Sequence, residues 1–276
     1  MPVERSLPSI GSRKPFLYSM EELADMTDNF SEKNLIGETL FTKLFGIILY
    51  NPTWLASVHR VISTQMKVLK EEVMFLTQPS AKQHPNVVNL LGYSDRRYLE
   101  AVVYDLNPLD TVHNLATTGS LTWLQRIKVA LGFARALEFL HDPKKPYLVR
   151  NINAAHIILD QDCNPKIFDF STMSGGILGK LTHLKEKLLT VGYDDPESFP
   201  LGGPEEGGFE YRPNHYLVHE SLVEDPGFHA SDGIMITELA MRCIQRELDK
   251  RPTMKDVVKH LEGLQAVQLY GNVVGM

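Results

Sequence analysis

The order of strand-like and helix-like segments limits the fold of this chain more than any other feature. Alternating or β-branched runs dominate its first part, and apolar residues at helical spacing interrupt them once, at 66–77. The clearest helix comes next, at 122–141, where an apolar stripe runs until Asp142-Pro143 ends it. Helical stretches at 234–247 and 254–265 follow. Strands followed by helices predict an α+β fold of two lobes. The strands are expected at 41–50, 54–62, 87–93, 100–106, 157–159 and 166–168.

Local signals place the domain boundaries. The first fifteen residues are rich in Ser and Pro, which is typical of a flexible arm. Ser19 and Glu22 have the spacing of a capping box and predict a short helix to about Asp28. The expected organisation is a flexible arm at 1–15, a first lobe with an N-terminal extension at 16–107, a second lobe at 108–267 and a C-terminal tail at 268–276.

Composition excludes several classes of partner. The chain has 276 residues, a net charge of −6 and two cysteines, Cys163 and Cys243, which lack the spacing of metal ligands. A mildly acidic chain without a basic stripe is not expected to bind nucleic acid. No apolar run approaches the roughly 20 residues of a membrane span. We therefore expect a cytoplasmic protein without direct membrane insertion, whose association with the plasma membrane, if any, is made through partners.

Six sequence motifs, in order, resemble those of the plant receptor-like kinase family, in particular its receptor-like cytoplasmic (Pelle-type) branch. The resemblance covers about 16–264 and implies a protein kinase-like two-lobe fold, with ATP and Mg²⁺ as the ligands of an active member. The motifs are "TDNFSEKNLIG" (27–37), "HPNVVNLLGY" (84–93), "LTWLQRIKVALGFARALEFLH" (121–141), "IILDQDCNPKIFDFS" (157–171), "VGYDDPE" (191–197) and "DKRPTM" (249–254).

The phosphate-covering loop of the family is degenerate here. Of its three glycines only Gly37 is present, and Thr39 and Thr42 stand at the other two positions. Side chains there obstruct the close approach of backbone to phosphate, so a tight strand turn is favoured over a phosphate cradle. Lys43 lies just past the loop; it is expected to face solvent rather than to act as a substitute cation.

Other parts of the implied nucleotide site are altered or vestigial. The strand lysine aligns with His59, whereas the helix glutamate that would pair with it survives as Glu72. Asp105 and Asn107 occupy the hinge between the lobes, where the backbone could still pair with an adenine edge. Asp169 survives from the D-F-G motif and could hold a metal weakly. ATP and Mg²⁺ are therefore possible but weak ligands, and no cofactor is required.

The catalytic loop has lost its chemistry by the same alignment. Asn151 replaces the aspartate that accepts the substrate's proton, and an amide has no basic carboxylate for that role. Asn153 replaces the loop lysine. His156 replaces the asparagine that would hold magnesium, which prefers oxygen ligands. No catalytic residue is expected, although Arg150 of the loop remains.

The residues that hold the family's fold together are retained here, whereas one helix of the second lobe is not found. The implied structural ion pair that ties the activation segment to the second lobe is present as Glu197 and Arg251. Only 54 positions separate them, and the long central helix of the second lobe is not found in the stretch 198–233. We expect that helix to be missing and its neighbours to lose a packing partner.

These substitutions favour an inactive kinase-like protein, or pseudokinase, that serves as an adaptor, decoy or scaffold. The segments "YSMEELADMTDNFS" and "RNIN" resemble a small plant group that pairs with intracellular immune receptors. The resemblance implies protein partners: such a receptor, another kinase or a pathogen effector, in plant immune signalling. The alternative is a weak ATP-binding Ser/Thr kinase with an atypical site that uses Lys43 and Asp169. A non-functional remnant is the third possibility.

Overall fold

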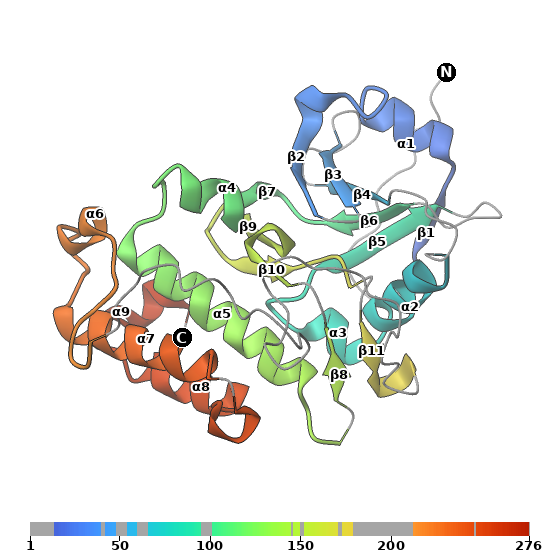
Figure 1. Ribbon diagram of the computed structural model, residues 1–276. Coiled ribbons are helices and arrows are strands. Elements are labelled where there is room, and N and C mark those ends of the chain that lie inside the picture. The colour runs from blue at the N-terminus through green and yellow to red at the C-terminus, as the bar shows by residue number, and fades with distance from the viewer. Residues whose placement is uncertain are drawn as a thin grey trace, which may run out of the picture.

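The computed structural model has a strand-rich lobe and a helix-rich lobe (Figure 1). It describes residues 14–39, 42–47, 54–59, 66–94, 101–144, 146–149, 152–170, 173–178, 212–245 and 247–275; for 54–59 and 66–68 it describes the backbone alone. The two-lobe α+β architecture predicted from the sequence is confirmed.

The first lobe is built on one six-stranded sheet, in the order β1-β5-β6-β4-β3-β2. The edge strand β1 was not predicted and pairs parallel to β5, whereas the other pairs are antiparallel. Helices α2 (Met66–Leu76) and α3 (Pro79–Gln83) connect β4 to β5. The strands are β1 (Phe16–Tyr18), β2 (Leu35–Glu38), β3 (Thr42–Gly46), β4 (Trp54–His59), β5 (Asn89–Ser94) and β6 (Ala101–Asp105).

The N-terminal extension is part of this lobe. Helix α1 (Met20–Met26) begins with the predicted capping box, in which Glu22 N donates to Ser19 Oγ at 3.1 Å and Ser19 N donates to Glu22 Oε2 at 2.8 Å. The helix buries Leu23 and Met26 against the sheet, so the extension shares the core of the lobe.

The second lobe contains small strand pairs and a group of helices. Helix α5 (Trp123–Leu140) agrees with the predicted helix within one residue at each end. Side chains along α5 pack against the sheet β10-β9-β7: Val129 clusters with Leu159, and Leu140 with Ile158. The remaining elements are β7 (Pro108–Thr111), α4 (Val112–Thr117), β8 (Tyr147–Leu148), the 3₁₀ turn η2 (Ala154–His156), β9 (Ile157–Asp160), β10 (Pro165–Ile167), β11 (Ser174–Gly175), η3 (Gly176–Leu178), α6 (Glu220–Val223), α7 (Ala230–Cys243), η5 (Leu248–Lys250), α8 (Met254–Glu262) and α9 (Gln265–Val274).

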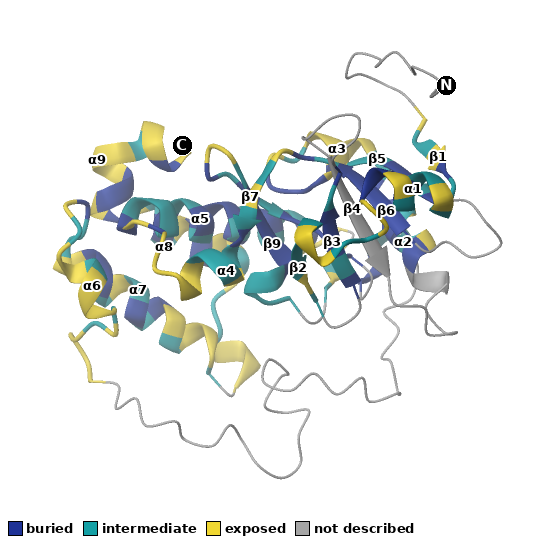
Figure 2. Ribbon diagram, turned by 90° about the horizontal axis from the view of Figure 1, so that it is seen from above, coloured by how far each residue is buried: buried dark blue, intermediate teal, exposed yellow. Residues whose placement is uncertain are grey.

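The apolar stripe of α5 is covered in spite of the expected loss of a central helix. Ile127 and Leu131 are 2% and 0% exposed, and they belong to a cluster with side chains of α7, α8 and α9. Asp232, near the start of α7, accepts the backbone N–H groups of Gln265 and Ala266 at 2.8 Å each and so joins α7 to the start of α9. Figure 2 shows these helices side by side with buried inner faces. The loss of packing that the sequence suggested is therefore not seen for α5.

Two further expectations need correction or limits. The tail predicted at 268–276 is instead mostly the second half of α9, and Val274 is 2% exposed against α5. The shortened stretch 198–233 is described only from 212, where α6 and the start of α7 lie. No helix that could cross a membrane was found among the residues described.

Candidate functional site

The turn between β2 and β3 closes onto a buried carboxylate. Asp169, 3% exposed and in a left-handed conformation (φ 59°), follows β10. Its Oδ2 lies 2.8 Å from Thr39 Oγ1 and 3.2 Å from Thr42 Oγ1, and the two hydroxyls are 2.8 Å apart. Two hydroxyl hydrogens serve these three contacts, so either both hydroxyls donate to Asp169, or one donates to Asp169 and accepts from the other. The residues that replace two loop glycines thus bind the surviving carboxylate.

The same turn is held by its own backbone. Thr39 N donates to Thr42 O at 2.9 Å, and Thr42 N donates to Thr39 Oγ1 at 3.1 Å. Thr42 itself is 1% exposed. These hydrogen bonds of the turn direct the two threonine side chains inward, toward Asp169. The predicted turn is the better description of this segment than a phosphate cradle.

A histidine lies on the other side of the carboxylate. His156 Nε2 is 3.7 Å from Asp169 Oδ2, and His156 Nδ1 is 3.0 Å from Asn153 Oδ1. Burial lowers the pKa of His156, against the opposing effect of Asp169, so the imidazole is mainly neutral at pH 7. Beside Asp169, an imidazole nitrogen stands where the family alignment implies an amide oxygen. This donor set fits Mg²⁺ poorly, because that ion binds through hard oxygen ligands.

Tyr104 connects Asp169 to Glu72 in the interior. The Tyr104 hydroxyl donates to Glu72 Oε1 at 2.6 Å and accepts from Asp169 N at 3.4 Å. Burial, and secondly the negative charge of Asp169, raise the pKa of Glu72 to about 8, whereas hydrogen bonds from Tyr104 and Phe170 N act in the opposite direction. Glu72 is thus mostly neutral at pH 7. A neutral carboxyl group does not offer the charge that an ATP-binding lysine would need as its partner.

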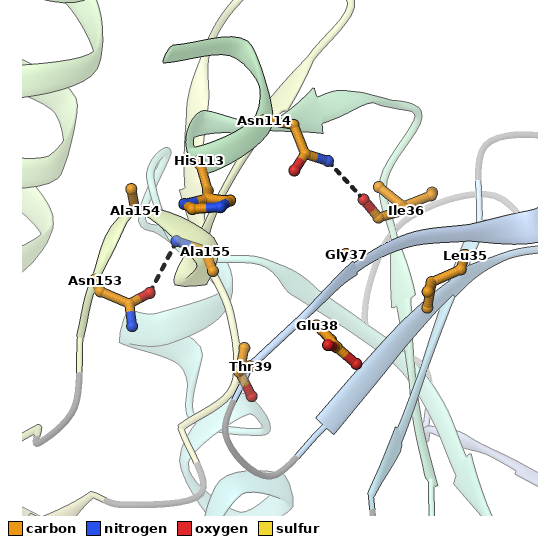
Figure 3. Close-up of a pocket in the computed structure, with 10 residues that line it drawn as sticks. All are labelled: Leu35, Ile36, Gly37, Glu38, Thr39, His113, Asn114, Asn153, Ala154 and Ala155. Carbon is orange, nitrogen blue, oxygen red and sulfur yellow. Dashed lines mark hydrogen bonds between the residues drawn. The ribbon is translucent and has the colours of Figure 1, made fainter. Parts of the chain in front are cut away.

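An open pocket of about 660 Å³ lies in front of this network (Figure 3). Asn114 Nδ2 donates to Ile36 O at 2.9 Å and joins α4 to β2 across its rim. Gly37 lines the pocket where β2 approaches β7: a Cβ atom at Gly37 would lie 2.8 Å from Thr111 Cγ2. The retained glycine thus serves a close contact within the chain itself. The lining residues are Leu35, Ile36, Gly37, Glu38, Thr39, His113, Asn114, Asn153, Ala154 and Ala155.

The structure brings together some of the predicted site residues and leaves others apart. Gly37 and Asn153 line the open pocket, whereas Glu72, His156 and Asp169 belong to the buried network. Asp105 ends β6 and the exposed Asn107 follows it; neither lines the pocket. Among the described residues, no three His, Cys, Asp or Glu side chains are grouped closely enough to hold a metal ion.

Several of the predictions concern residues beyond the described ones. Arg150, Asn151 and Glu197 lie outside the described residues, so the loss of the catalytic base and the pair with Arg251 stay predictions. Arg251 Nε donates to Gln245 O at 2.6 Å. For His59 only the backbone is described, opposite Thr42 in the β3–β4 pair.

Lys43 does not reach into the site. Its neighbour Thr42 faces the interior, and successive side chains of a strand point to opposite faces. Lys43 Nζ instead forms an ion pair with Glu32 Oε1 at 2.7 Å, and Glu32 is exposed. The expected solvent-facing role of Lys43 is confirmed.

Three residues of the network were not recognised as such from the sequence. Thr39 and Thr42 were interpreted only as replacements of loop glycines, and Tyr104 was not among the predicted site residues. Thr39 is 130 positions from Asp169 along the chain. The one available signal was chemical: both replacements carry a hydroxyl group near the expected position of the Asp169 carboxylate.

The comparisons with known proteins agree with this geometry. A family model described as protein tyrosine and serine/threonine kinase matches residues 56–199. The chain belongs to the protein kinase family. It is 26% identical to the probable serine/threonine-protein kinase PBL16 of Arabidopsis thaliana, over 91% of this chain and 74% of that protein. It is 28% identical to PBL12 (95% and 72%) and 35% identical to PBL2 (67% and 46%), both also probable serine/threonine-protein kinases of Arabidopsis thaliana.

The alignment with PBL16 extends over 303 positions, which is more than the 276 residues of this chain. It therefore contains gaps in this chain, as an internal shortening requires. For PBL2 the alignment reaches less than half of the relative's length, so this chain spans only part of some of its relatives.

Proposed function

We propose that this kinase-family chain is a protein-binding module that does not transfer phosphate. The observation that carries the proposal is the binding of Asp169 Oδ2 by the hydroxyls of Thr39 and Thr42. A magnesium ion would have to displace these contacts to reach that oxygen. It would then find His156 as a neighbouring donor, a poor ligand for magnesium.

The sequence supports the same proposal independently. Asn151 cannot act as a general base, and Asn153 supplies no positive charge to a migrating phosphoryl group. Loss of a single electrostatic group of this type costs roughly 3–4 kcal/mol of barrier. With several groups altered, the chemistry of the site is not expected to give useful turnover.

Transfer of radiolabelled phosphate from ATP to a generic substrate protein tests the proposal. The wild-type chain should give no transfer above a heat-treated control with either Mg²⁺ or Mn²⁺. A matched variant restores the family residues by Thr39→Gly, Thr42→Gly, His59→Lys, Asn151→Asp, Asn153→Lys and His156→Asn. The proposal also expects this variant to bind ATP where the wild type does not.

An active atypical kinase remains the alternative, because the relatives are named probable kinases and Asp169 is retained. It predicts transfer by the wild type that disappears in Asp169→Ala. Lys43 does not support this alternative, because it forms an ion pair with Glu32. Transfer that survives purification to a single species and is lost in Asp169→Ala would replace the proposal by the alternative.

For the partner, we propose an intracellular nucleotide-binding leucine-rich-repeat immune receptor, on the family resemblance of the segments "YSMEELADMTDNFS" and "RNIN". The adaptor role follows from this: a kinase-like surface that is retained without its chemistry can be offered to a pathogen effector or an active kinase. Affinity purification from plant tissue should recover such a receptor with the chain. Repeated recovery of the chain without any receptor of this class would count against this partner.

A further inference from the structure

A second cavity, which shares no lining residue with the pocket of Figure 3, is lined by positively charged side chains. It has a volume of about 260 Å³ and lies between α5, the start of β10, the segment before β5 and the end of α9. Lys128, Arg135 and Lys166 contribute side chains to it, and none of its lining residues is acidic. The lining residues are Pro85, Asn86, Lys128, Gly132, Arg135, Asn164, Pro165, Lys166, Val274 and Gly275.

Helix α5 forms this cavity through its spacing. Lys128, Gly132 and Arg135 are four and three residues apart, which places them on one face of the helix. A Cβ atom at Gly132 would lie 2.5 Å from Pro165 Cγ and 2.7 Å from Asn86 Nδ2. The glycine therefore lets β10 approach between the two cations. Figure 2 shows the end of α9 beside α5, and Val274 and Gly275 at this end line the cavity.

Each cation is fixed at the edge of the cavity by a carbonyl group. Lys128 Nζ donates to Asp162 O at 2.8 Å, Lys166 Nζ donates to Pro85 O, and Arg135 Nη1 donates to Gly275 O at 2.9 Å. An ammonium group has three N–H donors and a guanidinium group has five. Within the part of the chain that the structure describes, Lys128 and Lys166 each use one donor in this way, which leaves two N–H donors on each for a ligand.

The charges are only partly compensated by the protein. Among the described residues, Arg135 forms an ion pair with Glu262, at 2.9 Å, outside the lining of the cavity. Burial lowers the pKa of Lys166, with Asp160 opposing the shift, and burial, followed by the charge of Lys166, lowers the pKa of His84. Three cations around a cavity without an acidic lining residue favour an anion.

We infer that this cavity binds a phosphoryl group carried by a serine or threonine side chain of another polypeptide. Three cations from two elements, α5 and β10, suit a dianion with three strong acceptor oxygens better than a carboxylate, which one guanidinium satisfies. The volume is below the range of about 300–1,000 Å³ that is common for drug-sized ligands, which fits a small group on a side chain. The net charge of −6 on the chain disfavours extended polyanions such as nucleic acid or an anionic membrane.

The test uses the 276-residue chain labelled with ¹⁵N, and two probes at fixed ionic strength: inorganic phosphate and a glycine-flanked phosphoserine tripeptide. Both should shift the amide resonances of Gly132 and Gly275, and the tripeptide should saturate with a Kd of about 1 mM or tighter. The unphosphorylated tripeptide should cause no such shifts. Saturation by inorganic phosphate alone would mean that a free anion, and not a phosphorylated polypeptide, is the ligand.

Two charge-removing variants and one matched control complete the design. Lys128→Met and Lys166→Met should each weaken tripeptide binding about tenfold, because each removes a charged donor. The control Lys255→Met, an exposed cation on α8, should change it less than about twofold. Equal affinity in all three variants, or absence of saturable shifts at Gly132 and Gly275 up to about 10 mM phosphate, overturns the inference. Preferential binding to vesicles that contain phosphoinositides would assign the cavity to a membrane instead.

Discussion

The neutral state of Glu72 predicts an unusual dependence of stability on pH. Its pKa is about 8 in the folded chain, against 4.5 for an exposed glutamate. Between these values the folded chain keeps a proton that the unfolded chain has lost, and unfolding releases it. The free energy of unfolding that Glu72 contributes is therefore complete below pH 4.5, and it falls as the pH rises through 8.

The contribution of Glu72 to the free energy of unfolding is best measured between pH 6.5 and 8. Burial lowers the pKa values of His84, His141 and His156, and these groups make stability rise with pH only up to about their unfolded pKa of 6.5. Above that value Glu72 dominates. One pKa unit corresponds to 1.36 kcal/mol, so the contribution of Glu72 should fall by about 1.5–2 kcal/mol over this range.

Urea titrations of wild type and Glu72→Gln at several pH values measure this contribution, since glutamine keeps the acceptor for Tyr104 and has no proton to release. The difference between the two free energies of unfolding should change by about 1.5–2 kcal/mol from pH 6.5 to 8. The exposed control Glu224→Gln should follow the wild type at every pH. Parallel curves for wild type and Glu72→Gln would show that Glu72 is charged at pH 7 and would refute the reasoning.

Three further predictions concern packing and hydrogen bonding. Thr39→Val removes a donor to buried Asp169 and should lower the free energy of unfolding by about 1.5–3 kcal/mol in urea titrations; an unchanged value would mean that the bond is not formed. Leu131→Ala, in the fully buried stripe of α5, should cost about 2–5 kcal/mol, and a cost below 1 kcal/mol would contradict a packed second lobe. Gly132→Ala should cost about 1–3 kcal/mol by overpacking against Pro165, measured by thermal melting, whereas Gly263→Ala, with ordinary space and a right-handed conformation, should cost less.

Periodicity and turn chemistry were sufficient for most of the fold. The stripe of α5 and the capping box of α1 are local patterns, and both were found at the predicted places. Strand β1 was missed because three residues carry too little periodicity, and its partner β5 is more than seventy positions away. Helix α9 was missed beyond its first residue because its outer face carries exposed apolar residues such as Leu269 and Val273, which blur the helical stripe.

The sequence was enough to predict which residues form the site, but not which contacts they make. The alignment identified Glu72, His156 and Asp169 as the relevant side chains, and all three are buried together. It could not show that Thr39 and Thr42 bind Asp169, because such a contact depends on how the two lobes meet. Nor could it show that Glu72 is neutral, since that follows from burial beside Asp169. Long-range contacts and desolvation are properties of the folded chain.

Calorimetric titration of the wild-type chain with ATP and Mg²⁺ tests most directly whether the hydrogen bonds from Thr39 and Thr42 to Asp169 exclude the nucleotide. We expect no saturable heat, and no rise in melting temperature at millimolar ATP, because a ligand that bound the native state would stabilise it. A magnesium-dependent Kd in the micromolar range, lost in Asp169→Ala, would contradict the account.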